Sequence, residues 1–203
     1  MVHRRSRGGA ADRGVRLDAG DAPRRCAHDC RAGAERVRRA GGAPVNDREL
    51  LRHTVATLAY RAAKATRGAP ETFASFKAGP TSRTPVEVLA HMGDLLDWAL
   101  AMAKGTPKWH TSEPLPWNEE RERFFAALRT FDDRLASPDP LQYELTRLFQ
   151  GPIADALTHT GQLTMLRRLH GAPVKGESYN RADIVAGRVG AEQTPADPRY
   201  EFE

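Results

Sequence analysis

One stretch near the C-terminal end of the sequence places a carboxylate, an imidazole and an amide on one helix face, and the first two could bind a metal ion. At helical spacing Asp155, His159 and Gln162 fall on a single face, which continues through Leu166 and Leu169. A face that ends in leucines is expected to point toward a core, where an unpaired carboxylate costs several kcal/mol. A bound cation would offset that cost, so the stretch predicts a metal site.

A second predicted helix supplies a third candidate ligand. His91 lies between Val88 and Leu95 on the apolar face of that helix, and it is therefore expected to point inward. Asp155 and His159 are one turn apart, which places their side chains about 6 Å from each other. Two imidazole nitrogens and one carboxylate oxygen leave coordination positions open, an arrangement typical of a reactive metal.

Zn²⁺, Ni²⁺ or Fe²⁺ would each accept this set of ligands. The alternative interpretation needs no metal. In this interpretation His91 is a hydrogen-bonded core residue, and Asp155 interacts favourably with the positive, N-terminal end of the helix dipole.

Three further polar residues have candidate roles around this site. Gln162 could hydrogen-bond a bound ligand or a metal-bound water, or alternatively a neighbouring helix. Asp94 could orient the free ring nitrogen of His91, although its position favours a solvated surface carboxylate. His53 could be a fourth ligand or a base, although its place beside Leu51 favours the boundary of the core.

Other residues suggest interpretations of their own. Arg167 and Arg168 could bind an anionic substrate, but near a helix C-terminus they are expected to complement the helix dipole. Trp98 and Trp109 could line a pocket, although aromatic residues between helices usually belong to the core. We expect the two remaining histidines of this part of the chain at the surface; they are His110 and His170.

The elements that position these residues are helices. A capping box at Asn46 begins the first, and Thr84 followed by proline begins the second. The predicted helices span about 46–68, 84–105, 118–137 and 151–170. Residues 141–150 are expected to form a short helix or turn, and residues 176–203 a tail that packs on the helices without a strand. This pattern predicts an all-α fold, a four-helix bundle.

The N-terminal residues 1–45 differ from the rest of the chain. They contain 11 Arg, no Lys and five acidic residues, whereas residues 46–203 carry 20 basic and 21 acidic side chains. Without aromatic residues and with seven glycines, this segment is predicted to be a disordered leader. Three alternative interpretations remain for this segment. It could be a basic arm that binds nucleic acid, non-conserved sequence translated from an upstream start, or a segment that contains a zinc site. That zinc site would use Cys26, His28 and Cys30.

Hydropathy and charge limit the remaining possibilities. No apolar run reaches the roughly 18 residues of a membrane span, and no hydrophobic signal segment occurs at the N-terminus. We therefore expect a cytoplasmic protein that does not associate with membranes. The near balance of charge over residues 46–203 argues against nucleic acid as a partner and leaves a small-molecule substrate.

Two motifs resemble a known family. The residues His159-Thr-Gly161-Gln162-Leu163, followed by Leu166-Arg167-Arg168 and Gly171, resemble the fourth-helix signature of the DinB/YfiT-like family. The stretch Pro85-x-x-x-Leu89-Ala90-His91 is similar to the start of its second helix. The resemblance covers roughly residues 46–175.

The resemblance implies a four-helix bundle, often paired as a homodimer, with a divalent ion held by three side chains. Carried over, these ligands are His91, Asp155 and His159. The commoner residue at position 155 in this family is histidine, so Asp155 makes the site harder and more negative. The resemblance also implies an S-transferase or isomerase that uses a low-molecular-weight thiol, or a metal-assisted hydrolase. Because the cysteines lie only in residues 1–45, the thiol must come from a cofactor. The alternative is a non-catalytic stress-response protein that binds a metal or a small ligand.

Overall fold

The computed structural model describes residues 46–203. The predictions for residues 1–45, including the disordered leader, the nucleic-acid arm and the zinc site at Cys26, His28 and Cys30, lie outside the described residues.

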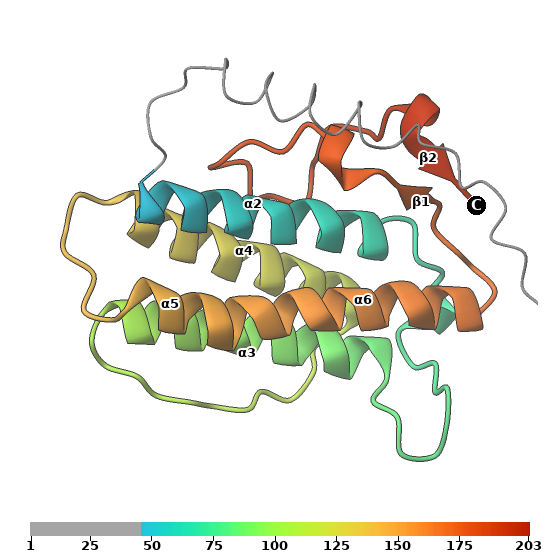
Figure 1. Ribbon diagram of the computed structural model, residues 1–203. Helices are drawn as coiled ribbons and strands as arrows, with labels where there is room; N and C mark the ends of the chain where they lie inside the picture. The colour runs from blue at the N-terminus through green and yellow to red at the C-terminus, as the bar shows by residue number, and fades with distance from the viewer. Residues whose placement is uncertain (1–45) are drawn as a thin grey trace, which may run out of the picture. The chain divides into compact units, whose positions relative to one another are not determined.

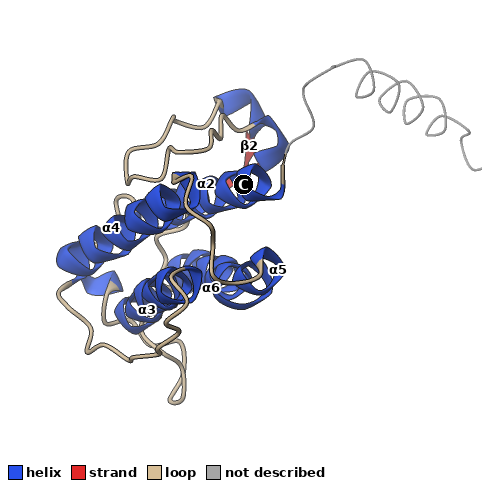
Figure 2. Ribbon diagram, turned by 90° about the vertical axis from the view of Figure 1, so that its left-hand side faces the viewer, coloured by secondary structure: helices blue, strands red, loops and turns tan. Residues whose placement is uncertain are grey.

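The described part is mostly helical, as the sequence predicts. Its helices of more than one turn are α2 (Asp47–Thr66), α3 (Pro85–Ala103), α4 (Trp117–Ala136) and α6 (Ala154–Leu169). Helix α2 contacts α4 and α6, and α3 contacts the same two helices, so the four enclose one core (Figure 1). Figure 2 shows the same helices turned by 90°. The site discussed below lies where α3 and α6 run side by side.

Local sequence signals begin these helices where they were expected. The Asn46 side chain accepts a hydrogen bond from the Glu49 backbone over 2.8 Å at the start of α2. Thr84 and Glu87 form a complete capping box at the start of α3, with Pro85 in the first turn. Gly105, at φ 78°, follows α3 in the left-handed conformation that glycine adopts without strain.

The core packs small residues against large ones. The face of α2 turned to the core is rich in alanine, which allows its neighbours to approach closely, and the space is filled by aromatic and aliphatic side chains. The largest fully buried members include Phe73, Phe124, Phe125, Phe131 and Met92.

The short helix expected within residues 141–150 is α5 (Leu145–Leu148). Helix α6, which carries two candidate ligands, begins at Ala154 and not at the predicted Gly151, because a π-helical turn, η2 (Phe149–Ile153), leads from α5 directly into it. Pro152 explains the wide turn, because its ring would clash with the preceding turn of a regular α-helix and it has no N–H to donate.

The C-terminal tail contains a strand pair that the sequence analysis excluded, so that prediction was wrong. Strands β1 (Gly176–Glu177) and β2 (Glu201–Phe202) pair antiparallel, with Glu177 opposite Glu201. Two-residue strands carry no alternating pattern. Buried hydrogen bonds to α2 hold them instead, because Glu177 accepts from Tyr60 Oη over 2.7 Å and from Lys64 Nζ over 2.8 Å.

Short 3₁₀ turns occupy the remaining irregular segments: η1 (Glu71–Phe73), η3 (Tyr179–Arg181) and η4 (Pro198–Tyr200). Across residues 46–203, no helix combines the length and the apolar character needed to cross a membrane.

Candidate metal site

The structure brings the three predicted ligands together. His91 Nε2 lies 3.5 Å from Asp155 Oδ2, and His159 Nε2 lies 3.4 Å from Asp155 Oδ1. One ligand atom from each residue can be chosen so that all three lie within 4.8 Å of one another, a separation that one metal ion can span. Each of the two carboxylate oxygens of Asp155 lies near one imidazole nitrogen.

Helix geometry accounts for this convergence. Asp155 and His159 are one turn apart at the start of α6, and His91 comes from the middle of α3, which packs against α6. The two imidazole rings meet edge to face, with centroids 4.8 Å apart. His159 is buried, whereas 46% of the Asp155 side chain is exposed. The group therefore lies at the rim of the core, and one side faces solvent.

Gln162 has a role that the sequence analysis did not consider. Its Oε1 lies 2.8 Å from His159 Nδ1, so it contacts a candidate ligand and not a neighbouring helix. An amide oxygen only accepts, which places the ring proton on Nδ1. The lone pair of Nε2 then points toward the carboxylate, the tautomer that a metal ligand requires.

The surroundings keep His91 neutral near pH 7. Burial lowers its pKa below the ordinary value, the nearby His159 and Arg83 lower it further, and Asp155 opposes them. A neutral imidazole has a free lone pair on one nitrogen, so His91 can act as a ligand.

Asp94 does not contact His91, and both sequence interpretations of Asp94 were wrong. It is buried rather than solvated, with 1% exposed. Its carboxylate accepts hydrogen bonds from the backbone and hydroxyl of Ser112 over 2.9 and 2.8 Å and pairs with Arg123 over 3.1 Å. These partners lie on the loop before α4 and on α4 itself, which local spacing in α3 cannot reveal.

A second group of side chains also has the spacing of metal ligands. It consists of Asp94, Asp97 and His110, with ligand atoms within 4.8 Å of one another. Here the Arg123 guanidinium already supplies the positive charge, at 3.1 Å from Asp94 and 3.5 Å from Asp97. The triad of His91, Asp155 and His159 has no such internal cation, which makes it the stronger candidate site.

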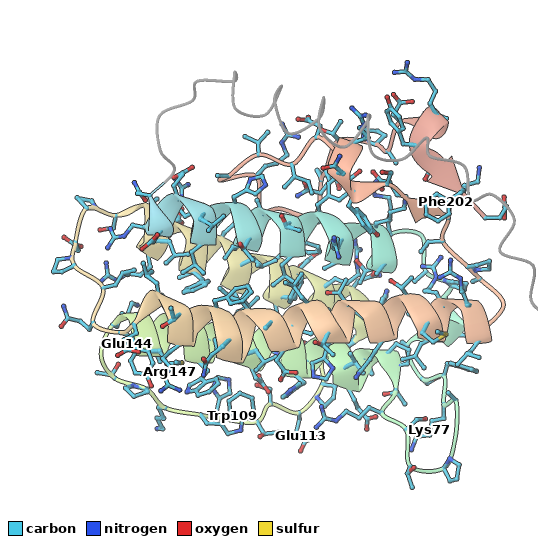
Figure 3. All side chains as sticks on the ribbon, viewed as in Figure 1. Lys77, Trp109, Glu113, Glu144, Arg147 and Phe202 are labelled. Carbon is cyan, nitrogen blue, oxygen red and sulfur yellow. The ribbon has the colours of Figure 1, made fainter. Side chains whose placement is uncertain are left out.

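Two tryptophans flank the triad on the side of α3. The Trp109 ring lies edge to face against His91 at 5.6 Å and against Trp98 at 5.8 Å. Trp109 is 43% exposed, so it does not belong to the core. Figure 3 shows it on the loop between α3 and α4, which Asp94 anchors through Ser112. It therefore covers one edge of the site.

The remaining polar candidates lie elsewhere. His53 is exposed on α2 and belongs to neither metal-spaced group, so its predicted place at the core boundary was wrong. Arg167 is buried and donates to backbone oxygens of Ala172 and Arg67 over 2.7 and 3.1 Å, tying the end of α6 to the end of α2. It is therefore a structural residue. His170 is partly buried against Phe73, and Arg168 is exposed.

Three shallow pockets border the triad. One of about 410 Å³ includes Trp98 and Asp155, one of about 430 Å³ includes His159 and Gln162, and one of about 260 Å³ includes His91. Together they give a small molecule access to the open side of the three ligands.

The sequence analysis did not single out Arg83, which lines two of these pockets. It lies immediately before the Thr84 cap, and with Glu87 and His91 it follows a spacing of four residues. This four-residue spacing is the sequence signal from which Arg83 could have been placed beside His91.

Comparisons with known proteins add no relative from which a role could be inferred. No family model, no curated protein and no solved structure matches the chain.

Proposed function

We propose that the protein is a divalent-metal-dependent enzyme of the DinB-like type, with His91, Asp155 and His159 as metal ligands. The packing of the four long helices, in which α2 and α3 each adjoin α4 and α6, supports the four-helix bundle that this proposal assumes. The observation that carries the proposal is the orientation of the His159 ring against Asp155.

In a neutral His159 ring, the hydrogen bond from Nδ1 to Gln162 leaves the lone pair of Nε2 directed at Asp155 Oδ1 over 3.4 Å. Two acceptors that face each other repel, and a cation between them converts the repulsion into attraction. His91 is held neutral on the other side of the carboxylate. A metal ion bound to all three side chains satisfies both lone pairs and the carboxylate charge together.

The spacing of the ligands agrees with this role. Bonds of about 2.0–2.1 Å to a tetrahedral ion place neighbouring ligand atoms about 3.3–3.4 Å apart. The two nitrogen–oxygen distances are close to that separation, and each is to a different carboxylate oxygen of Asp155: 3.5 Å from His91 to Oδ2 and 3.4 Å from His159 to Oδ1. Two nitrogens and one oxygen suit Zn²⁺, Ni²⁺ or Fe²⁺.

When bound with an open coordination position, such an ion lowers the pKa of a water or thiol toward neutrality. The residues of this chain hold the ligands in place. Gln162 fixes the His159 tautomer, Trp109 shields the edge of His91, and the half-exposed Asp155 leaves the approach open. Within residues 46–203 there is no cysteine. A thiol-dependent transfer or isomerisation therefore uses a low-molecular-weight thiol as co-substrate, and hydrolysis uses water.

The test is metal content, measured by mass spectrometry of the purified full-length chain and three variants. We expect about one ion per chain in the wild type and in His53→Ala, which removes an exposed histidine outside the site. We expect loss of most of the metal in His91→Ala and Asp155→Asn. Equal metal content in all four proteins would refute the proposal.

Turnover separates the enzyme from the alternative, a non-catalytic stress-response protein that binds a metal or small ligand. Conjugation of a low-molecular-weight thiol to an aryl halide, and hydrolysis of an activated ester, are measured for the wild type and His159→Ala. An enzyme shows one of these activities and loses it in the variant. A protein that binds metal at the triad and shows neither supports the non-catalytic alternative.

A further inference from the structure

We infer that Arg83 and the apolar pocket beside His159 bind a small organic anion, a carboxylate with an apolar body, as the substrate of the metal site. The inference rests on the proposed function, and it names the class of substrate that this site accepts.

The size and the apolar lining of the pocket beside His159 indicate the kind of ligand body that it accepts. It has a volume of about 430 Å³, which is within the range of small-molecule sites. Its wall is formed mainly by Val88 of α3 and by Met165 and Leu166 of α6, with His159 at one end. Met165 is 56% exposed and is therefore accessible to a ligand from solvent. The apolar wall indicates a substrate with a hydrocarbon or aromatic body.

A positive charge at the rim of the same pocket indicates that the ligand carries a carboxylate. Arg83 lines this pocket and also the neighbouring pocket that contains His91. In the described part of the chain, the Arg83 guanidinium forms neither an ion pair nor a hydrogen bond, unlike Arg52 and Arg123, which both bind carboxylates. A guanidinium without a protein partner beside an apolar wall is suited to a carboxylate ligand.

The charge of Glu87 interacts with that of Arg83, but the two side chains form no ion pair. Glu87 accepts hydrogen bonds from the backbone and hydroxyl of Thr84 over 2.7 and 2.9 Å, and the capping box holds it there. Arg83 therefore keeps its donors available, and its charge reaches the triad, where it is one cause of the lowered pKa of His91.

The two features fix the orientation of the ligand. With its carboxylate on Arg83 and its body along Met165 and Leu166, a bound anion lies beside His159 and faces the open side of the three metal ligands. The polar pocket near His91 is also lined by Glu87 and Glu113, whose negative charges disfavour a second negative group on the ligand. The site is therefore matched to a monoanion.

The test compares hexanoate with hexanamide, which has the same shape and no charge, by calorimetric titration of the full-length chain. We expect the wild type to bind hexanoate about tenfold more tightly. Arg83→Gln should bind the two ligands equally. Lys77, which is labelled in Figure 3, lies on the same loop as Arg83 but lines none of the pockets beside the triad. Lys77→Gln should therefore keep the wild-type preference for hexanoate over hexanamide.

Two further titrations test the apolar wall. Met165→Ser should weaken hexanoate and hexanamide by the same factor, because it removes apolar contact and no charge. Inorganic phosphate should bind more weakly than hexanoate. Phosphate binding as tight as hexanoate, or a wild type that binds no hexanoate, would overturn the assigned substrate class.

Titrations with and without added metal separate this inference from the proposed function. If the triad binds no metal, the proposed function fails, while the Arg83-dependent preference is still measured in the metal-free protein. If metal binds normally but Arg83→Gln keeps the wild-type preference, the inference is wrong and the metal site stands.

Discussion

Gln162 lies one turn beyond His159 on α6, and its amide oxygen is 2.8 Å from the Nδ1 atom of that histidine. The contact determines which ring nitrogen carries the proton and which way the ring points. It makes Gln162 a positioning residue, whose effect on a bound ion passes through His159.

Replacing Gln162 should therefore weaken metal binding without removing a ligand. We expect Gln162→Leu to lower the metal affinity about 10–100-fold. Gln162→Glu keeps an acceptor opposite Nδ1 and should retain the wild-type affinity. The measurement is a competition titration against a chromophoric chelator. Equal affinities for Gln162→Leu and the wild type would show that the contact is incidental.

Metal binding should be insensitive to pH above the ordinary histidine pKa and weaken below it. Protonated imidazole cannot bind a metal, and burial above all lowers the pKa of His91 from its ordinary 6.5. We expect constant affinity from about pH 8 to 6.5 and a progressive loss at lower pH.

Because Arg83 also lowers the pKa of His91, Arg83→Gln should move this loss to higher pH. Lys77→Gln should not move it. The same chelator competition, repeated across the pH range, gives both curves. Identical curves for the wild type and Arg83→Gln would contradict the electrostatic argument.

Two glycines allow a matched test of the ion-pair network between α3 and α4. A Cβ atom at Gly93 would lie 2.7 Å from Arg123 Nη2, whereas one at Gly161 on α6 would contact nothing within 4 Å. The Arg123 guanidinium cannot yield freely, because it binds Glu120 over 2.6 Å and Asp94 over 3.1 Å, and both carboxylates are buried.

We expect Gly93→Ala to lower the free energy of unfolding by about 2 kcal/mol, since displacing the guanidinium weakens its ion pairs with two buried carboxylates. Gly161→Ala should raise it by about 1 kcal/mol through higher helix propensity. Chemical denaturation measures both. A stabilising effect of Gly93→Ala would show that the network tolerates displacement of Arg123.

The contacts of the tail predict loss of stability at alkaline pH. Burial, followed by the hydrogen bond to Glu177, raises the pKa of Tyr60. Burial lowers the pKa of Lys64, but hydrogen bonds to Glu177 and Glu201 outweigh it and raise the pKa overall. The folded protein thus keeps protons that the unfolded chain releases near pH 10.0 and 10.5, the ordinary values of the two groups. Stability must therefore fall as the pH rises through this range.

Each such group contributes about 1.4 kcal/mol per pH unit while the proton difference persists. Denaturation at pH 8 and pH 11 should show this fall in the wild type and a smaller one in Glu177→Gln, which lacks the charge that holds both protons. The same fall in both proteins would place its origin outside this cluster.

The starts of α2 and α3 follow from local sequence and were predicted correctly, whereas Leu169, which was expected on the inward face of α6, is 58% exposed. The caps at Asn46 and Thr84 and the apolar periodicity mark the helices, and the four-residue spacing of Asp155 and His159 puts both on one face. The placement of His91 on the inner face of α3 then required only that α3 and α6 be neighbours.

Features that depend on distant partners could not be predicted. Asp94 resembles a surface carboxylate until α4 brings Arg123 to it, across 29 residues of sequence. Glu177 pairs with Tyr60 over 117 residues, and the strands it helps to position are too short to show a pattern. Arg83 precedes the first residue of α3, so the helical periodicity of the inward face does not include it.

The π-helical turn at Phe149–Ile153 has a consequence for how the site tolerates change. This turn sets the rotation of everything downstream, and removing a single residue from it would swing α6 by about 100° relative to α5. The carboxylate and imidazole at the start of α6 would then leave the neighbourhood of His91 with every side chain still present. Chain length in this short segment, more than amino-acid identity, is what keeps the three groups in register, so deletions there should be far less permissible than substitutions.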